Sequence, residues 1–202
     1  MIKHSMIILS CILFFAMAMI NVACTTPNET NSQTATISTS ENNQTTIDGL
    51  AVKLTLDQLI QNSDAIMIGK VAKILPARLI YVAQFNRELP CTDVIVETNR
   101  FLLGSAQAPN IAVQVWGGQI GGQTVSISDS PAFKLGEEVA LFLENVPEGS
   151  QPPEGIAAEN YFIVYGSAQG KYTVNNGALV DLEGNQIAIS DVEQKIKSIR
   201  GS

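Results

Sequence analysis

The chain has 202 residues, 46% of them hydrophobic, and a formal net charge of −7 from 19 acidic and 12 basic side chains. This acidic balance argues against binding to nucleic acid or to an anionic membrane surface, since both need clustered Lys and Arg. The only histidine is His4, in the N-terminal segment, so the rest of the chain offers neither Ser-His-Asp nor Cys-His catalysis nor histidine-ligated zinc. We expect no cofactor, no metal ion and no enzyme activity.

An export signal is predicted at the N-terminus, over residues 1–23. Lys3 supplies a positive charge, residues 6–20 form an apolar run, and residues 22–24, Val-Ala-Cys, place small side chains before a cysteine. This is the pattern of a secretory leader with a cleavage site. The apolar run is also close to the roughly 20 residues of a membrane-spanning helix, so an uncleaved anchor helix is the alternative.

The Val-Ala-Cys sequence at residues 22–24 resembles the lipobox of prokaryotic lipoproteins. In that family the cysteine thiol is acylated and becomes the N-terminus of the mature chain, so the resemblance implies that Cys24 carries a lipid. Asn21 departs from the pattern, because the family usually has Leu or another aliphatic residue there. In either reading the chain would be tethered to the extracytoplasmic face of the cell membrane.

Residues 24–48 are dominated by Thr, Ser, Asn and Gln. Such a segment has too little apolar area to offset its chain entropy, which predicts a disordered linker. Asn28 and Asn43 each begin an Asn-x-Thr sequon. They would be exposed glycosylation sites in an organism that glycosylates exported proteins, while chance is the alternative in a segment of this composition.

A folded, β-rich domain is predicted over residues 49–202. Thr55 and Gln58 form a capping box at the start of an amphipathic helix over residues 54–62. A β-branched run then predicts a strand at residues 65–75, while residues 77–90 fit either a long loop or an inserted hairpin.

Strands dominate the remainder of the domain. Alternating or continuous apolar runs predict them at residues 92–103, 110–116, 123–127, 139–143, 161–165 and 171–174. Glycine-rich turns at 117–122 and 166–170 predict hairpins between the strands that they join. Ser190 and Glu193 form a second capping box, which predicts a helix over residues 190–198.

Three segments in this order resemble the netrin-like module of tissue inhibitors of metalloproteinases, complement tails and related prokaryotic secreted domains: residues 63–71, 101–104 and 136–143. The resemblance implies a mainly β fold, an OB-like five-stranded barrel with short N- and C-terminal helices. The inhibitors act through an N-terminal cysteine that is held by disulfides and chelates the protease metal, and nothing in residues 49–202 reproduces it. Protease inhibition is therefore not implied.

Cys91 is the only cysteine after Cys24, so it cannot form an internal disulfide, and we expect it to be a small buried side chain rather than a nucleophile. The segments at 166–171 and 181–185 lack the helix of a phosphate loop and the spaced acidic series of a calcium loop, so both are interpreted as turns. Trp116, before a glycine turn, is a candidate recognition residue, with packing at the barrel rim as the alternative.

These features predict a non-catalytic binding module for an unknown envelope protein or glycan, held at the membrane by an N-terminal lipid or helix anchor. The loops at residues 77–90 and 117–122 are its expected surfaces. The alternatives are an envelope hydrolase that works through two carboxylates and a passive structural lipoprotein.

The anchor can be tested by detergent phase partitioning of the wild-type chain and of Cys24→Ser. We expect the wild type in the detergent phase and a shift of the variant toward the aqueous phase, because the thiol to which the lipid is attached has been removed. Equal partitioning of the two chains, with the leader uncleaved in both, would contradict the lipoprotein prediction.

Overall fold

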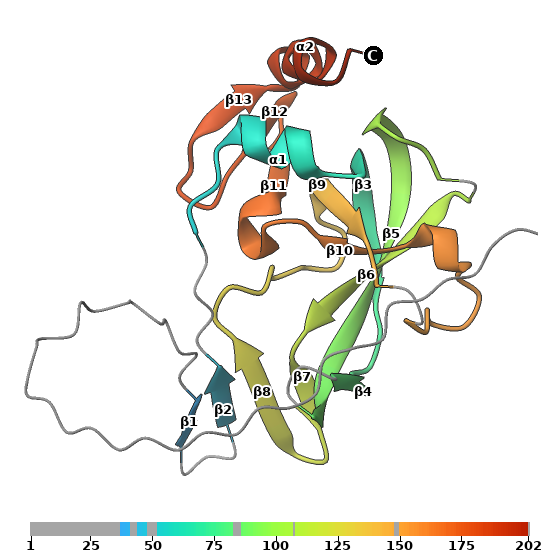
Figure 1. The fold of residues 1–202 in the computed structure, drawn as a ribbon, viewed down its shortest axis with the longest axis vertical. Coiled ribbons are helices and arrows are strands. Elements are labelled where there is room, and N and C mark those ends of the chain that lie inside the picture. Colours follow the sequence, from blue (N-terminus) through green and yellow to red (C-terminus); the bar gives the residue numbers. More distant parts are fainter. Residues whose placement is uncertain are drawn as a thin grey trace, which may run out of the picture. The chain divides into compact units, whose positions relative to one another are not determined.

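The computed structural model describes residues 37–40, 44–47, 52–82, 86–106, 108–147 and 150–201, all in the unit from Gln33 to Ser202. They form a mainly β fold with two short helices (Figure 1). Neither helix in this part of the chain is long and apolar enough to cross a membrane. The leader over residues 1–23 and the predicted modification sites Cys24, Asn28 and Asn43 lie outside the described residues.

A closed five-stranded barrel is the centre of the fold. Its strands are β3 (Ala65–Ile74), β5 (Arg87–Leu103), β6 (Asn110–Trp116), β9 (Glu138–Asn145) and β10 (Tyr161–Val164). Around the barrel β3 pairs with β5, β5 with β6, β6 with β10, β10 with β9, and β9 again with β3. Only the β6–β10 pair is parallel among these five. The closed circuit confirms the predicted OB-like barrel.

The barrel interior is filled by side chains from alternate strand positions, as the pleat of a β-strand requires. The central residues are aliphatic or aromatic and almost fully buried: Met67, Val71, Val94, Val96, Ile111, Val113, Val139, Leu141, Leu143 and Phe162. β9 is buried on both faces, which explains its continuous apolar sequence. Closing the barrel therefore buries a continuous apolar core.

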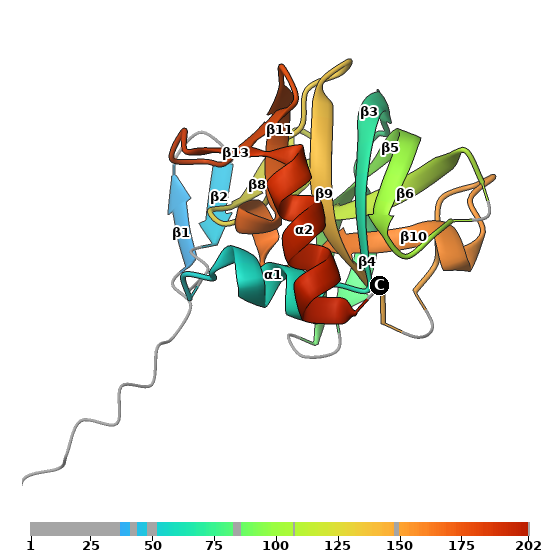
Figure 2. The ribbon, with the colours of Figure 1, turned by 90° about the horizontal axis from the view of Figure 1, so that it is seen from above.

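The outer face of β3 and β9 is covered by the two helices, α1 (Leu56–Asn62) and α2 (Ile189–Arg200), which pack against each other (Figure 2). Leu59 and Ile60 of α1 join Val192 and Ile196 of α2 in this second core. The C-terminal Arg200 also donates hydrogen bonds to the carbonyl groups of Ile60, Gln61 and Ser63. These bonds satisfy carbonyls that a helix leaves open at its C-terminal end.

The two predicted capping boxes have different outcomes. The box at α1 is confirmed: the Thr55 hydroxyl accepts from the Gln58 N–H, and the Gln58 side chain accepts from the Thr55 N–H. The prediction of a box at α2, formed by Ser190 and Glu193, is wrong. The helix begins at Ile189, and its N-cap residue, Ala188, makes no side-chain capping hydrogen bond. Strand β13 (Gln186–Ala188) runs directly into α2, which places Ser190 inside the first turn.

Both predicted hairpins pair differently in the structure. The first is formed by β7 (Gly118–Ile120) with β8 (Gln123–Ile127), and neither of these strands pairs with β6. The second is not a hairpin: β10 and β11 (Lys171–Asn175) both pair with β9, and the 3-10 helix η3 (Ser167–Gly170) lies between them. β11 instead forms a hairpin with β12 (Ala178–Val180).

Part of the predicted disordered linker is in strands. β1 (Ile37–Ser40) and β2 (Gln44–Ile47) pair with each other, and β2 pairs in parallel with β8, giving the strand order β1-β2-β8-β7. The structure differs here from the prediction for residues 24–48. The end of β2 is Thr-Thr-Ile, whose β-branched side chains favour strands, and the edge of β8 supplies the backbone partners that composition cannot reveal.

Gly69 lies at a close approach between β3 and β5. It lies at a register shift between these strands, and a Cβ there would meet the Glu97 carbonyl oxygen, with Met67 Cε 2.7 Å and Val96 Cγ1 2.9 Å away. We expect Gly69→Ala to lower the free energy of unfolding by about 3 kcal/mol, because a backbone atom must move. Urea unfolding followed by Trp116 fluorescence measures this change.

Gly184→Ala is the control for this prediction. Nothing lies within 4 Å of a Cβ at Gly184, whose φ is +85°, so it should cost only about 1 kcal/mol of backbone strain. Equal losses in the two variants would contradict the close approach at Gly69.

Candidate functional site

The segment at residues 77–90 contains a hairpin, one of the two structures left open by its sequence. β4 (Arg78–Val82) pairs antiparallel with the first part of β5. The Gly118 backbone packs against the start of this hairpin, since a Cβ on Gly118 would lie 2.5 Å from Ala77 Cβ and 2.7 Å from Thr92 Oγ1. The two segments predicted as binding surfaces, 77–90 and 117–122, therefore meet at one end of the barrel.

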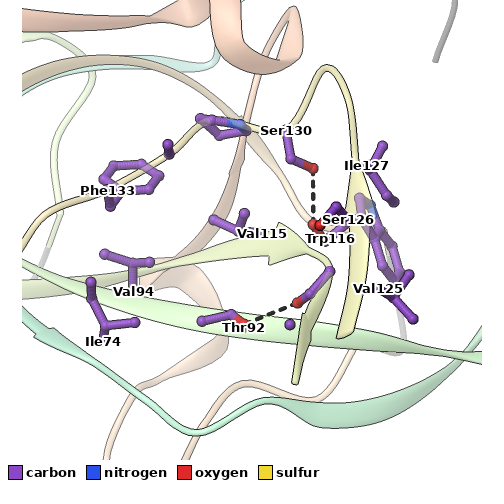
Figure 3. Close-up of a pocket in the computed structure, with 14 residues that line it drawn as sticks. Ile74, Thr92, Val94, Val115, Trp116, Val125, Ser126, Ile127, Ser130 and Phe133 are labelled. Carbon is purple, nitrogen blue, oxygen red and sulfur yellow. Dashed lines mark hydrogen bonds between the residues drawn. The ribbon is translucent and has the colours of Figure 1, made fainter. Parts of the chain in front are cut away.

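A cavity of about 290 Å³ lies at this end (Figure 3). Its wall combines the ends of β3, β5 and β6 with the β7–β8 hairpin and the loop that follows it. The lining residues are Ile74, Thr92, Val94, Val115, Trp116, Gly117, Gly118, Val125, Ser126, Ile127, Ser130, Pro131, Ala132 and Phe133. Most of these side chains are apolar, so the cavity suits an apolar group.

Trp116 is held at the cavity by the turn that follows it. The Trp116 carbonyl accepts a hydrogen bond from the Ser130 hydroxyl, and the Gly117 carbonyl accepts one from the Thr92 hydroxyl, both at 2.9 Å (Figure 3). The Gly117 N–H donates to the Pro90 carbonyl at 2.8 Å, and Gly117 has φ +107°, a conformation that favours glycine. The sequence signal for Trp116 was thus a tryptophan beside a turn that only glycine can make.

On the other face of β5 a buried polar network holds the β4–β5 hairpin against the barrel. The Asp93 carboxylate, 1% exposed, accepts hydrogen bonds from Arg78 Nε and from the Tyr161 hydroxyl, each at 2.7 Å. Arg78 also donates to the Gln151 carbonyl at 2.6 Å, and the Tyr161 hydroxyl lies 2.9 Å from Gln114 Oε1. A buried carboxylate with a guanidinium and a phenol is well satisfied.

This network joins five parts of the chain: β4, β5, β6, β10 and the β9–β10 connection. Because strand side chains alternate, Asp93 points outward while its neighbours Thr92 and Val94 face the cavity. The network therefore supports the cavity wall from the opposite face of β5, and its polar groups do not line the cavity. No sequence pattern predicts this network, because its members lie far apart along the chain.

Cys91 is buried and unpaired, as predicted. Burial, with a smaller contribution from the Asp93 charge, raises the pKa of the Cys91 thiol to about 12. Burial and the hydrogen bond to Asp93 also raise the pKa of Tyr161 far above its ordinary value. Both groups keep their protons at neutral pH, so neither is an activated nucleophile.

The described carboxylates do not converge at the cavity, and none of them is among its lining residues. Burial alone would raise the pKa of Glu137, but hydrogen bonds, chiefly from Lys171 at 2.6 Å, outweigh it and lower that pKa. Burial, with the nearby Asp64 charge, raises the pKa of Glu144. Within the described ranges no three His, Cys, Asp or Glu side chains are grouped to hold a metal ion. Among the described residues, the cavity lining thus presents apolar surface and three hydroxyl side chains, without a carboxylate.

No protein-family model matches this chain, and no curated protein matches it. The assignment of the barrel to the OB type consequently rests on strand order and pairing. The netrin-like resemblance of residues 63–71, 101–104 and 136–143 stays a prediction.

The raised thiol pKa predicts a loss of stability in alkali. The unfolded chain ionises Cys91 near pH 9.0 and the native chain near 12, so the unfolded state releases its proton first as the pH rises. The contribution of this thiol is complete below pH 9 and is lost between pH 9 and 12, at a slope of about 1.4 kcal/mol per pH unit. Urea unfolding between pH 8.5 and about 10.5 measures that slope.

Cys91→Ala separates the thiol from other titrating groups. Tyr161 still contributes to the slope in this variant, but the Cys91 part should disappear, whatever the variant loses in overall stability. Identical slopes for the variant and the wild type would show that the thiol ionises as easily in the native state as in the unfolded chain.

Proposed function

We propose that the protein is a non-catalytic binding module, tethered to the extracytoplasmic face of the cell membrane through Cys24, and that the barrel end with the cavity is its binding end. The observation that carries this proposal is the apolar cavity itself, built where the hairpin at residues 77–90 meets the turn at 117–122. Ligand sites in proteins are concave and mostly apolar, and they are largely formed before the ligand arrives.

Exposed apolar side chains gather on the segments that border this cavity. Six large hydrophobic side chains are exposed in the described part of the chain, and four of them lie there: Ile74, Leu79, Tyr81 and Leu135. Ile74 lines the cavity, Leu79 and Tyr81 belong to β4, and Leu135 follows the cavity-lining Phe133 by two residues. Apolar surface concentrated beside one cavity is typical of an interaction site.

A protein partner fits this end better than a glycan does. Three hydroxyl side chains line the cavity, those of Thr92, Ser126 and Ser130, and two of them, Thr92 and Ser130, already donate to the carbonyls of Gly117 and Trp116. The described lining contains no charged or amide side chain with which to bind sugar hydroxyls. An apolar protein surface needs no such groups, because burial of apolar area drives its association.

In-cell crosslinking followed by pull-down of the full-length chain tests this proposal, with the anchored tail lacking residues 49–202 as control. We expect one stoichiometric envelope protein that is recovered only when the domain is present. Recovery of nothing beyond the control would contradict the binding module.

The Ala132→Trp variant, used in the same pull-down, tests whether the partner binds at the cavity. Ala132 is exposed at the rim, so an indole there would fill the cavity and should reduce recovery of the partner about tenfold or more. Ala157→Trp is the matched control, because Ala157 is also exposed but is not among the lining residues. Equal recovery with both variants would place the binding surface elsewhere on the domain.

A further inference from the structure

β4 is an edge strand with backbone groups that have no strand partner. Within the described residues it pairs only with β5, and Leu79 lies opposite Pro90. The Pro90 carbonyl accepts from Gly117 on the far side of β5, so the Leu79–Pro90 pair exchanges no hydrogen bonds. Since backbone groups alternate sides along a strand, the N–H and C=O groups of Leu79 and Tyr81 both point away from β5.

The side chains at these two positions are outside the cavity lining, but the strand register relates them to it, and the Tyr81 hydroxyl donates to Asn86 Oδ1. Leu79 lies opposite Pro90 on β5, and Tyr81 lies opposite Glu88. Pro90 and Glu88 are two and four residues before the cavity-lining Thr92, so all three side chains are on the same face of β5. The side chains of Leu79 and Tyr81 are therefore on the cavity side of the hairpin, where they are 49% and 59% exposed. An extended segment along the edge of β4 would place every second side chain on this side of the hairpin.

The charges around the edge differ from those of the whole chain. Lys134 is exposed and is next to the cavity-lining Phe133, whereas Lys73 lies opposite Ile95 and therefore points to the face of β3 that is turned away from the cavity. Neither lysine forms an ion pair with another described residue. Glu88 lies at the other end of β4, opposite Tyr81. Arg87 is at that end as well, opposite Val82. Lys134 is therefore the basic residue placed to pair with an acidic residue of a ligand at the cavity.

We propose that the edge of β4 binds an extended segment of a partner protein as an added strand. This inference rests on the proposed function and specifies how that barrel end binds. The N–H and C=O groups of Leu79 and Tyr81 would bond to the added backbone, and one bulky apolar side chain would enter the cavity. An acidic residue of the segment would lie toward Lys134. An open edge is a ready template for a further strand, and in strand addition the backbone supplies affinity while pockets supply specificity.

The test uses the full-length protein in nonionic detergent and a displayed library of random ten-residue peptides as the probe. We expect the selected peptides to alternate bulky apolar residues with polar ones and to carry acidic residues in one half. Synthetic copies are then N-methylated at every second amide. Methylation of the amides that face β4 should weaken binding about tenfold, since each lost hydrogen bond contributes about 1 kcal/mol, and methylation of the other set should change it less than about twofold.

Two variants at one position test the same bonds from the protein side. Tyr81→Pro removes an N–H that points away from β5, so it leaves the β4–β5 pairing intact and should weaken peptide binding about tenfold. Tyr81→Ala keeps the N–H and should cost less. If Tyr81→Pro fails to fold, which its Trp116 fluorescence would reveal, the N-methylated peptides alone decide.

Strand addition would be overturned if the library yields no enriched peptides, or if the two methylation patterns reduce peptide affinity equally. It would also be overturned if folded Tyr81→Pro binds the peptides with full affinity, or if the protein forms concentration-dependent dimers that Tyr81→Pro abolishes. The last result would assign the edge to a second copy of the chain. If the in-cell partner is still recovered with Tyr81→Pro, strand addition fails while the binding module stands. Loss of that partner with Ala132→Trp alone would assign binding to the cavity without the edge.

Discussion

The buried Asp93 carboxylate is the constraint on which the binding end depends. At 1% exposure the carboxylate is cut off from water and needs hydrogen-bond donors from the protein, which it receives from Arg78 and Tyr161 at 2.7 Å. Arg78 begins β4 and Tyr161 begins β10, the strand that closes the barrel. One carboxylate thus sets both the position of the edge hairpin and the point at which the barrel closes. Arg78 also bonds to the Gln151 carbonyl, which ties the β9–β10 connection to the same point.

The two faces of β5 have different roles in the structure: one carries the buried polar network and the other lines the cavity. Outward-facing Cys91 and Asp93 are fully buried beneath the hairpin and the β9–β10 connection, while inward-facing Thr92 and Val94 line the cavity. Because these residues alternate along one strand, the polar network can hold the cavity wall rigid without making the cavity polar. A wall fixed in this way loses little conformational entropy when a ligand binds, so more of the interaction energy remains as affinity.

Sequence reasoning succeeded where the signal is local. The Thr55–Gln58 capping box and the continuous apolar run of β9 depend on neighbouring residues, and both were confirmed. It failed where a strand pairs with another strand that is distant in the sequence. A glycine-rich segment joins β10 to β11, which predicted a hairpin, yet both strands pair with β9. β10 also pairs with β6, and this pairing closes the barrel. At the site, Trp116 could be found from its glycine turn. Phe133 and Arg78 could not, since only the folded barrel brings them to this end.

The N-terminal strands connect the predicted tether to the binding end. β2 pairs in parallel with β8, from Gln44 opposite Thr124 to Ile47 opposite Ile127, and the Ser128 N–H donates to the Ile47 carbonyl. Val125 and Ile127 of β8 line the cavity. The segment that leads from the proposed lipid anchor is therefore hydrogen-bonded to a strand of the cavity wall. The pairing of β2 with β8 thus adds two strands to the hairpin that lines the cavity, and backbone hydrogen bonds rather than side-chain packing join them.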